Sequence, residues 1–177
     1  MADVVVINKM DSADAAAIQT VRDSVARVNP SAVVIDAASP VFLDTPEAQQ
    51  LLRGKRCLAI EDGPTTTHGC MRTGAGTLAV AKFGGVLVDP RPFLKGTLSG
   101  TFSQYPDIGC LLPAMGYGDQ QSHDLQDTIN SSDADVVVIA TPIDLRRVCD
   151  IQKPCVRVRY ELQEIGSPRL NDVLADF

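Results

Sequence analysis

The sequence predicts an α/β fold with a mainly parallel, doubly wound sheet of about six to seven strands and helices on both faces. Two observations predict it. Apolar runs rich in valine and isoleucine recur along the 177 residues, and stretches with helical character separate them. Most of the runs are continuous rather than alternating, as expected of strands that helices cover on both faces. This is a Rossmann-like arrangement.

Seven runs are expected to form strands. The last of them alternates charged and apolar side chains, which indicates one wet face and favours an edge position, with an antiparallel neighbour as one alternative. The runs are residues 3–7, 32–36, 56–60, 86–88, 110–112, 135–140 and 156–160.

Five stretches are expected to form helices. Ser12 is the predicted N-cap of the first, and Thr45 with Pro46 opens the second. The stretches are residues 12–28, 45–52, 74–83, 119–129 and 168–177. Glycine and proline cluster in residues 61–76 and 89–109, so these two segments are predicted to be the working loops.

The length predicts one domain over residues 1–177, in which residues 1–44 resemble the tail of a nucleotide-binding fold and residues 45–177 carry the ligand loops. With 16 basic and 22 acidic residues the net charge is −6, so no overall basic field attracts a nucleic acid or an anionic membrane. No apolar run approaches the ~20 residues of a membrane span, and no signal-type segment begins the chain. We therefore expect a cytoplasmic protein.

The five cysteines are an odd number without any C-x-x-C spacing. This pattern indicates neither a disulfide framework nor a zinc site, and it favours buried thiols. Cys70 is the exception, since it lies in a glycine-rich loop where a helix N-terminus would lower a thiol pKa.

The first candidate site is Asn8-Lys9-Met10-Asp11, which ends the first apolar run. The segment resembles the N/T-K-x-D motif with which P-loop GTPases hold a purine base, Asn8, Lys9 and Asp11 being the matching residues. Ser39 follows the next predicted strand, where GTPases have a second base-contacting loop. The alternative is a simple turn in which Asp11 or Ser12 caps the following helix.

The second candidate site follows the third predicted strand. Glu61 and Asp62 are expected at the carboxyl end of a parallel strand, where such sheets bind ligands, and the pair can hold Mg²⁺. Hydroxyl groups and glycine N–H groups nearby are suitable donors to a phosphate. The phospho-ligand candidates here are Thr65, Thr67, His68, Gly74 and Gly76. The alternative is an ordinary capped loop with an exposed histidine.

Two further residues complete the predicted phospho-ligand site. Arg91 lies between two prolines, which present a preorganised guanidinium to phosphate or carboxylate, or else form a rigid surface turn. Thr141 follows the most apolar strand and faces the same sheet edge. The local sequence favours a Thr141 N-cap with Pro142 at the first helical position, which is compatible with a ligand contact. Met115 and Tyr117 are expected to pack rather than to take part in chemistry.

Together these motifs resemble the carboxyl-terminal part of the cyclic 2,3-diphosphoglycerate synthetase family, over essentially the whole chain. The matching segments are NKMD at 8–11, EDGPTTTHG at 61–69, GAG at 74–76, VDPRP at 88–92, LPAMGY at 112–117, TPIDL at 141–145 and VRVRYEL at 156–162. The resemblance implies a P-loop-related α/β unit, closure of a phosphoanhydride in 2,3-bisphosphoglycerate with ATP and Mg²⁺, and self-association.

The chain departs from that family in one respect. Its members are more than twice as long, and no segment here matches the phosphate loop G-x-x-x-x-G-K-[ST]. The leading hypothesis is a truncated or stand-alone domain that binds ATP or GTP, or a small phosphorylated metabolite, with Mg²⁺, and is catalytically incomplete alone. The alternatives are one subunit of a split synthetase with a P-loop-bearing partner chain, and an assembly module without a ligand, for example a homodimer.

Overall fold

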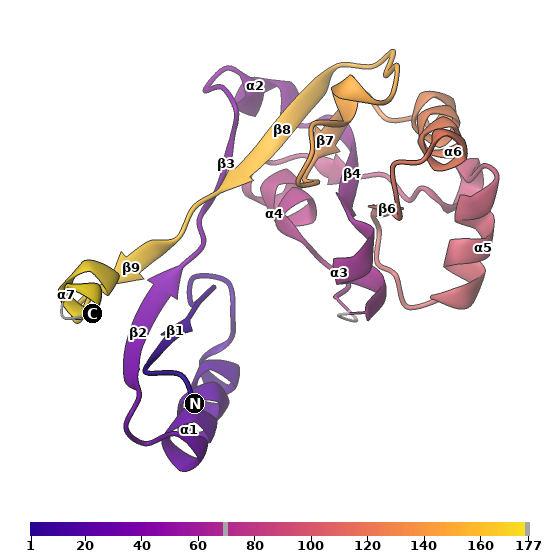
Figure 1. The fold of residues 1–177 in the computed structure, drawn as a ribbon. Helices are drawn as coiled ribbons and strands as arrows, with labels where there is room; N and C mark the ends of the chain where they lie inside the picture. The colour runs from indigo at the N-terminus through magenta and orange to yellow at the C-terminus, as the bar shows by residue number, and fades with distance from the viewer. Residues whose placement is uncertain (69–70, 176–177) are drawn as a thin grey trace. The chain divides into compact units, whose positions relative to one another are not determined.

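The structure is a computed structural model that describes residues 1–68 and 71–175. The described residues form two compact units (Figure 1). The first unit holds Met1–Pro40 and the described residues from Tyr160 onward, and the second holds Val41–Arg159. The boundary at Pro40 lies close to the expected one at residue 44, but the carboxyl-terminal residues join the first unit.

The first unit is a small α/β layer. Its sheet has the order β1 (Val4–Ile7), β2 (Val33–Ala38), β9 (Gln163–Ile165), and α1 (Ala15–Val28) connects β1 to β2. β1 and β2 are parallel, whereas β9 is antiparallel to β2. The last strand of the chain is therefore an antiparallel edge strand, as one of the predicted alternatives had it. This strand is β9, however, and not residues 156–160.

The first helix begins later than predicted. Asp14, not Ser12, is its N-cap, because the Asp14 carboxylate accepts a hydrogen bond of 2.8 Å from the Ala17 N–H. Ser12 is used in the preceding turn, where its N–H donates to the Lys9 carbonyl oxygen at 3.1 Å. The side chain that reaches the N3 amide defines the start of α1.

Replacing Asp14 by alanine is expected to lower the free energy of unfolding by about 1 kcal/mol, the usual effect of losing an N-cap. Ser12→Ala is the matched control and is expected to change it by less than about 0.5 kcal/mol. Urea unfolding followed by circular dichroism at 222 nm measures both. The assignment of the cap is contradicted by a larger loss in Ser12→Ala than in Asp14→Ala.

The second unit is built on a curled, mostly parallel sheet, and its six described strands agree with the predicted α/β fold class. β4 is central: it pairs in parallel with β5, β6 and β7, and β7 pairs in parallel with β8. The strand order is β3 (Val41–Leu43), β8 (Cys155–Tyr160), β7 (Val136–Ile139), β4 (Arg56–Asp62), β5 (Val86–Leu87), with β6 (Leu112–Ala114) beside the carboxyl half of β4.

The expectation of an edge, antiparallel strand at residues 156–160 is wrong for β8. This strand lies inside the sheet between β3 and β7, and it is parallel to β7. Val156 and Val158 are buried, whereas Arg157 is half-buried and its guanidinium donates to the Pro142 carbonyl oxygen at 2.7 Å. The alternation therefore reports a partly uncovered sheet face, not an edge.

Helices cover both faces of the central strands. Leu58 and Ile60 of β4 pack with α5 (Thr97–Gln104) and α6 (Asp119–Ser131), while Cys57 and Ala59 pack with α2 (Ala48–Leu52) and α4 (Ala75–Lys82). Successive residues of β4 thus enter opposite cores, which follows from the period of two in a strand. The continuous apolar runs are explained by this double burial.

Three other boundaries differ from those predicted. α2 begins at Ala48, whose N–H donates to the Thr45 hydroxyl at 3.3 Å. Both predicted loops contain helices, α3 (Gly63–His68) in one and α5 with a short 3-10 turn (Arg91–Phe93) in the other. The terminal helix α7 spans Leu170–Leu174, and residues 176 and 177 of the predicted segment lie outside the described residues. Within the described chain no helix is long and apolar enough to cross a membrane.

Candidate functional site

The loops after β4 and β7 lie at the point where the strand order of the sheet reverses, between these two neighbouring strands. From β4 the chain continues to β5 on one side, and from β7 it continues to β8 on the other. The crevice at such a switch point is where open α/β sheets bind ligands. An added Cβ at Gly76 would lie 3.0 Å from Glu61 Oε1 and 3.1 Å from the Ala140 Cβ, so the start of α4 lies against both strand ends.

Glu61 is the buried centre of this edge, with a relative exposure of only 4%. Its Oε1 accepts a hydrogen bond of 2.9 Å from the Thr77 N–H in the first turn of α4. Gly74 gives the carboxylate room, since an added Cβ there would lie 2.4 Å from Glu61 Oε2. The start of α4, where phosphate was expected to bind, therefore holds a carboxylate of the chain itself, a favourable position for negative charge.

Asp62, Tyr117 and Thr141 form a polar group near the carboxyl ends of β4, β6 and β7. The Asp62 Oδ2 accepts from the Thr65 hydroxyl at 2.9 Å. The pKa of Tyr117 is raised, mainly by burial and to a lesser degree by the nearby Asp62 carboxylate. A side-chain interaction with Thr141 lowers the same pKa and so opposes the shift. Thr141 is buried and also donates to the Ile143 carbonyl oxygen at 2.7 Å. Carboxylate and hydroxyl groups thus come from β4, from the loop after β6 and from the loop after β7.

The remaining residues of the predicted loop are tied into α3. Thr67 is buried and its hydroxyl donates to the Gly63 carbonyl oxygen at 2.9 Å, while the Thr67 hydroxyl oxygen lies 3.0 Å from His68 Nδ1. His68 is exposed, with its ring centroid 6.4 Å from that of Tyr105. Gly63 lies so close to the Ala114 carbonyl oxygen that an added Cβ would be 2.5 Å from it. The structure therefore fixes α3 firmly against β6.

Arg91 makes contacts within its own loops. Its guanidinium donates to Asp89 Oδ1 at 3.0 Å and to the Ile108 carbonyl oxygen at 2.5 Å, and it lies 5.2 Å from the centre of the Phe102 ring. These contacts join the segment after β5 to that before β6. They match the alternative of a rigid turn, and a phosphate contact by Arg91 stays a prediction.

The predicted base loop lies in the first unit, and its residues do come together. Asp11 Oδ1 accepts from the Ser39 N–H at 2.9 Å, which joins the loops after β1 and β2. Asn8 Oδ1 accepts from the Lys9 N–H at 2.8 Å, and Lys9 has a φ of 62°. A non-glycine residue in the left-handed region is uncommon and occurs often at ligand sites. The sequence thus located a compact, conformationally specific turn.

The predicted magnesium ligands are Glu61 and Asp62. Across residues 1–68 and 71–175, no group of three or more His, Cys, Asp or Glu side chains is arranged to hold a metal ion. Glu61 and Asp62 are successive residues of β4, so their side chains leave opposite faces of the strand. One carboxylate, here that of Asp62, is sufficient for Mg²⁺ where substrate phosphates supply the other oxygen ligands. Magnesium binding therefore remains a prediction that depends on a phosphorylated ligand.

Three thiols of the second unit, those of Cys57, Cys149 and Cys155, are expected to be unreactive. Burial raises the pKa of Cys57 to about 11 and also raises the pKa values of Cys149 and Cys155. We expect iodoacetamide at pH 8 to alkylate these three far more slowly in the folded chain than in urea, because the thiolate is the nucleophile. Mass spectrometry of the peptides measures it, and equal rates in both states contradict the expectation. Cys70, the predicted reactive thiol, lies outside the described residues.

Comparison with known proteins gives one extended similarity. No protein-family model matches the chain. The chain is 53% identical over 177 residues to a protein of Thermococcus kodakarensis named arginine synthetase ArcE, and the match covers 99% of this chain but 39% of that relative. The chain is homologous to part of a longer synthetase. The resemblance to the cyclic 2,3-diphosphoglycerate synthetase family remains a prediction beside this finding.

Sequence reasoning assigned two residues of the site differently. Tyr117 was expected only to pack, yet it lies close enough to Thr141 and Asp62 for both to affect the pKa of its hydroxyl. Thr77 was not among the predicted ligand residues, but its hydroxyl accepts from the Gly74 N–H at 2.8 Å. The position of Thr77, three residues after the glycine that precedes α4, was the available signal, because a helix N3 side chain commonly bonds the N-cap amide.

Proposed function

We propose that the chain is the ligand-binding part of a larger synthetase and is catalytically incomplete alone. The observation that carries the proposal is the 53% identity to part of a longer synthetase, combined with polar groups at the switch point of the sheet. The reaction is a property of the whole assembly, to which this chain contributes binding residues.

In this proposal the first unit binds the base of ATP or GTP. The bond between Asp11 and the Ser39 N–H holds two loops at the carboxyl ends of β1 and β2, and the Lys9 backbone is already strained into its turn. Asn8 and Asp11 would recognise the base edge, and Lys9 would cover the ring. A preformed loop lowers the entropy cost of binding.

The second unit would bind the reacting group. Asp62, with Glu61 behind it, would hold Mg²⁺ against phosphate oxygens, and the hydroxyl groups of Thr65 and Thr141 would donate to them. Glu61 holds the first turn of α4 through the Thr77 N–H, so it fixes the position of this edge. Asp62 is the residue through which the metal would contact the ligand.

The name of the relative changes the proposed substrate. Arginine is the product that this name indicates, whereas the family resemblance implies 2,3-bisphosphoglycerate. Asp62 suits arginine as well, because a guanidinium forms paired hydrogen bonds with a carboxylate. We place arginine first because the identity to the relative covers nearly the whole chain.

Calorimetry tests binding directly, with ATP, GTP, arginine and 2,3-bisphosphoglycerate, each with and without Mg²⁺. Asp11→Ala is expected to remove only the heat of binding of ATP or GTP. Asp62→Ala is expected to remove only the heat of binding of arginine or 2,3-bisphosphoglycerate. Asp23→Ala, an exposed change on α1, is the control for both. No heat with any ligand at millimolar concentration would refute the binding proposal.

The second candidate is one subunit of a split enzyme, which the 39% coverage of the relative favours. Arginine formation or phosphate release that appears only when the missing part of the relative is added would support it. Activity of the purified chain alone, lost in Asp62→Ala, would contradict both this candidate and the incomplete domain. An assembly module is the remaining candidate, and it predicts a stable homodimer without any ligand.

A further inference from the structure

β1 is an edge strand with one unpaired side. Among the described residues it pairs only with β2, in the order β1-β2-β9. The Val33 N–H donates to the Asp3 carbonyl oxygen at 2.9 Å, and Val4 is in register with Val33. In a parallel ladder alternate residues bond the same neighbour. The main-chain groups of Val4 and Val6 therefore face the open side.

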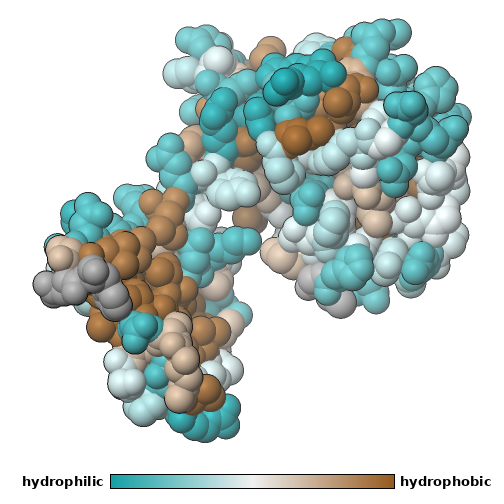
Figure 2. Space-filling model, viewed as in Figure 1, coloured by the Kyte–Doolittle hydropathy of each residue, from teal (hydrophilic) through white to brown (hydrophobic). Residues whose placement is uncertain are grey.

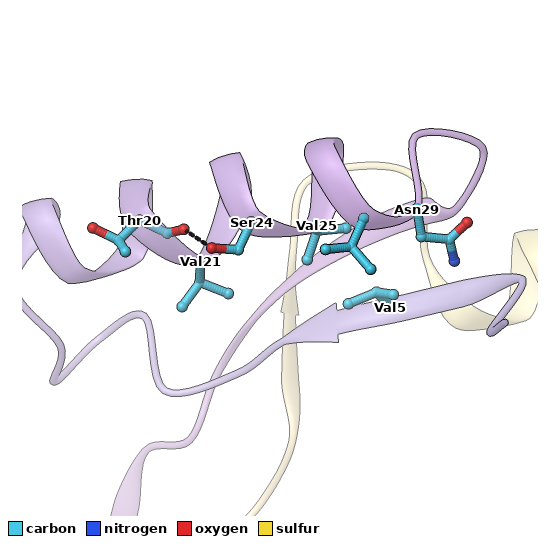
Figure 3. Close-up of a pocket in the computed structure, with 7 residues that line it drawn as sticks. Val5, Thr20, Val21, Ser24, Val25 and Asn29 are labelled. Carbon is cyan, nitrogen blue, oxygen red and sulfur yellow. Dashed lines mark hydrogen bonds between the residues drawn. The ribbon is translucent and has the colours of Figure 1, made fainter.

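An apolar groove of about 360 Å³ lies beside this edge (Figure 3). α1 forms one wall with Val21, Val25 and Val28, and Val5 of β1 lies opposite Val25 in the view. Polar side chains at the rim of the groove form hydrogen bonds within the helix. The Ser24 hydroxyl, for example, donates to the Thr20 carbonyl oxygen at 2.8 Å. The groove thus offers valine side chains rather than hydrogen-bonding groups.

The helix above the groove is poorly covered. Of the fourteen residues of α1, all described, none is fully buried, and Val21 and Val28 are 46% and 64% exposed. Apolar residues also gather on the visible surface of the first unit (Figure 2). An edge strand and an exposed apolar stripe that meet at one place are typical of an interaction surface.

We propose that this surface, formed by the open side of β1 and the valine stripe of α1, binds a β-strand from the part of the synthetase that this chain does not contain. The occupant is the polypeptide corresponding to the relative's residues outside the 177 aligned ones, and the relative is long enough to supply it because the chain spans only 39% of it. The added strand pairs in parallel with β1 and places apolar side chains beneath α1. This inference rests on the proposal that the chain is part of a larger synthetase.

Parallel pairing is the arrangement that the first unit already uses. β1 and β2 are parallel and α1 connects them across one face of the sheet. A further parallel strand beside β1 would extend the sheet under the same helix, and it would cover Val21 and Val28. Parallel strands are normally buried on both faces, whereas the residues Val4, Val5 and Val6 are now only half-buried.

The test is co-expression of the 177-residue chain with the remainder of the Thermococcus kodakarensis relative, followed by affinity purification and light scattering. We expect a one-to-one complex in which the amide hydrogens of Val4 and Val6 become protected from exchange. Absence of a complex would overturn the inference. So would a homodimer that buries the same surface, because its occupant would be a second copy.

Two variants test the surface itself. Val6→Pro removes an outward N–H, which an edge strand tolerates, and Val21→Glu places a carboxylate in the groove. Each is expected to weaken the complex by at least about tenfold. Val6→Pro removes a main-chain hydrogen bond to the added strand, and Val21→Glu requires a charge to be buried in the groove. Leu174→Glu, a change at a 54% exposed residue outside the groove, is the control and should leave the affinity unchanged.

Circular dichroism and thermal unfolding of each variant alone show that loss of the complex is not loss of the fold. Unchanged affinity in both Val6→Pro and Val21→Glu would overturn the inference. None of these assays contains a nucleotide or another ligand. The ligand-binding proposal can therefore fail in calorimetry while the complex forms, and the two failures are distinguishable.

Discussion

Glu61→Ala is expected to lower the free energy of unfolding of the second unit by about 3 kcal/mol. The buried carboxylate accepts from the Thr77 N–H and fills the space beside Gly74 and Gly76. Its removal leaves a buried amide without its acceptor and opens a cavity between β4 and α4. Loss of a hydrogen bond to a charged group and loss of packing both contribute.

Two variants separate the causes. Glu61→Gln keeps the size and one acceptor oxygen, so its loss should be smaller than that of Glu61→Ala. Glu47→Ala is the matched control, because Glu47 is an exposed acidic residue at the start of α2 whose side chain makes no capping bond. Urea unfolding followed by circular dichroism compares the three. Equal midpoints for Glu61→Ala and Glu47→Ala would show that Glu61 does not hold α4.

The sequence was sufficient to predict the central strands, because their valine and isoleucine runs record burial on both faces. It misplaced the edge, since the alternation in β8 reports an uncovered face while its hydrogen bonds are made on both sides. It also missed α5. That helix is rich in serine, threonine and glycine, and the Asp124 carboxylate, 27 residues away in the sequence, accepts from the Thr97 N–H and hydroxyl. Tertiary contacts of this kind override weak local propensity.

The candidate site was predictable where it depends on strand ends. Glu61 and Asp62 end β4 and Thr141 follows β7, and the carboxyl ends of parallel strands must share one edge of a sheet. The roles of the individual residues were less predictable. The sequence shows that Gly74 and Gly76 leave room for another group close to the backbone, but it does not show which group that is. Only the structure shows that their neighbour is the Glu61 carboxylate.

Gly96→Ala is expected to lower the free energy of unfolding by about 2 to 4 kcal/mol. Gly96 has a φ of 49°, which disfavours a side chain, and an added Cβ would lie 2.2 Å from Asp124 Oδ1. The carboxylate would have to move away from the start of α5. Gly100→Ala is the matched control within α5, because nothing lies within 4 Å of its added Cβ. That change should stabilise the helix by up to about 1 kcal/mol.

The pH dependence of Gly96→Ala identifies the group that moves. Hydrogen bonds from the Thr97 N–H and hydroxyl hold the pKa of Asp124 below its ordinary value. A lowered pKa contributes stability above the ordinary value, and this is lost as the pH falls through the folded-state pKa. The difference in unfolding free energy between the wild type and Gly96→Ala should therefore be largest near neutral pH and should narrow below about pH 4. A difference that is constant across this range would assign the whole effect to the backbone strain of residue 96, with Asp124 still in place.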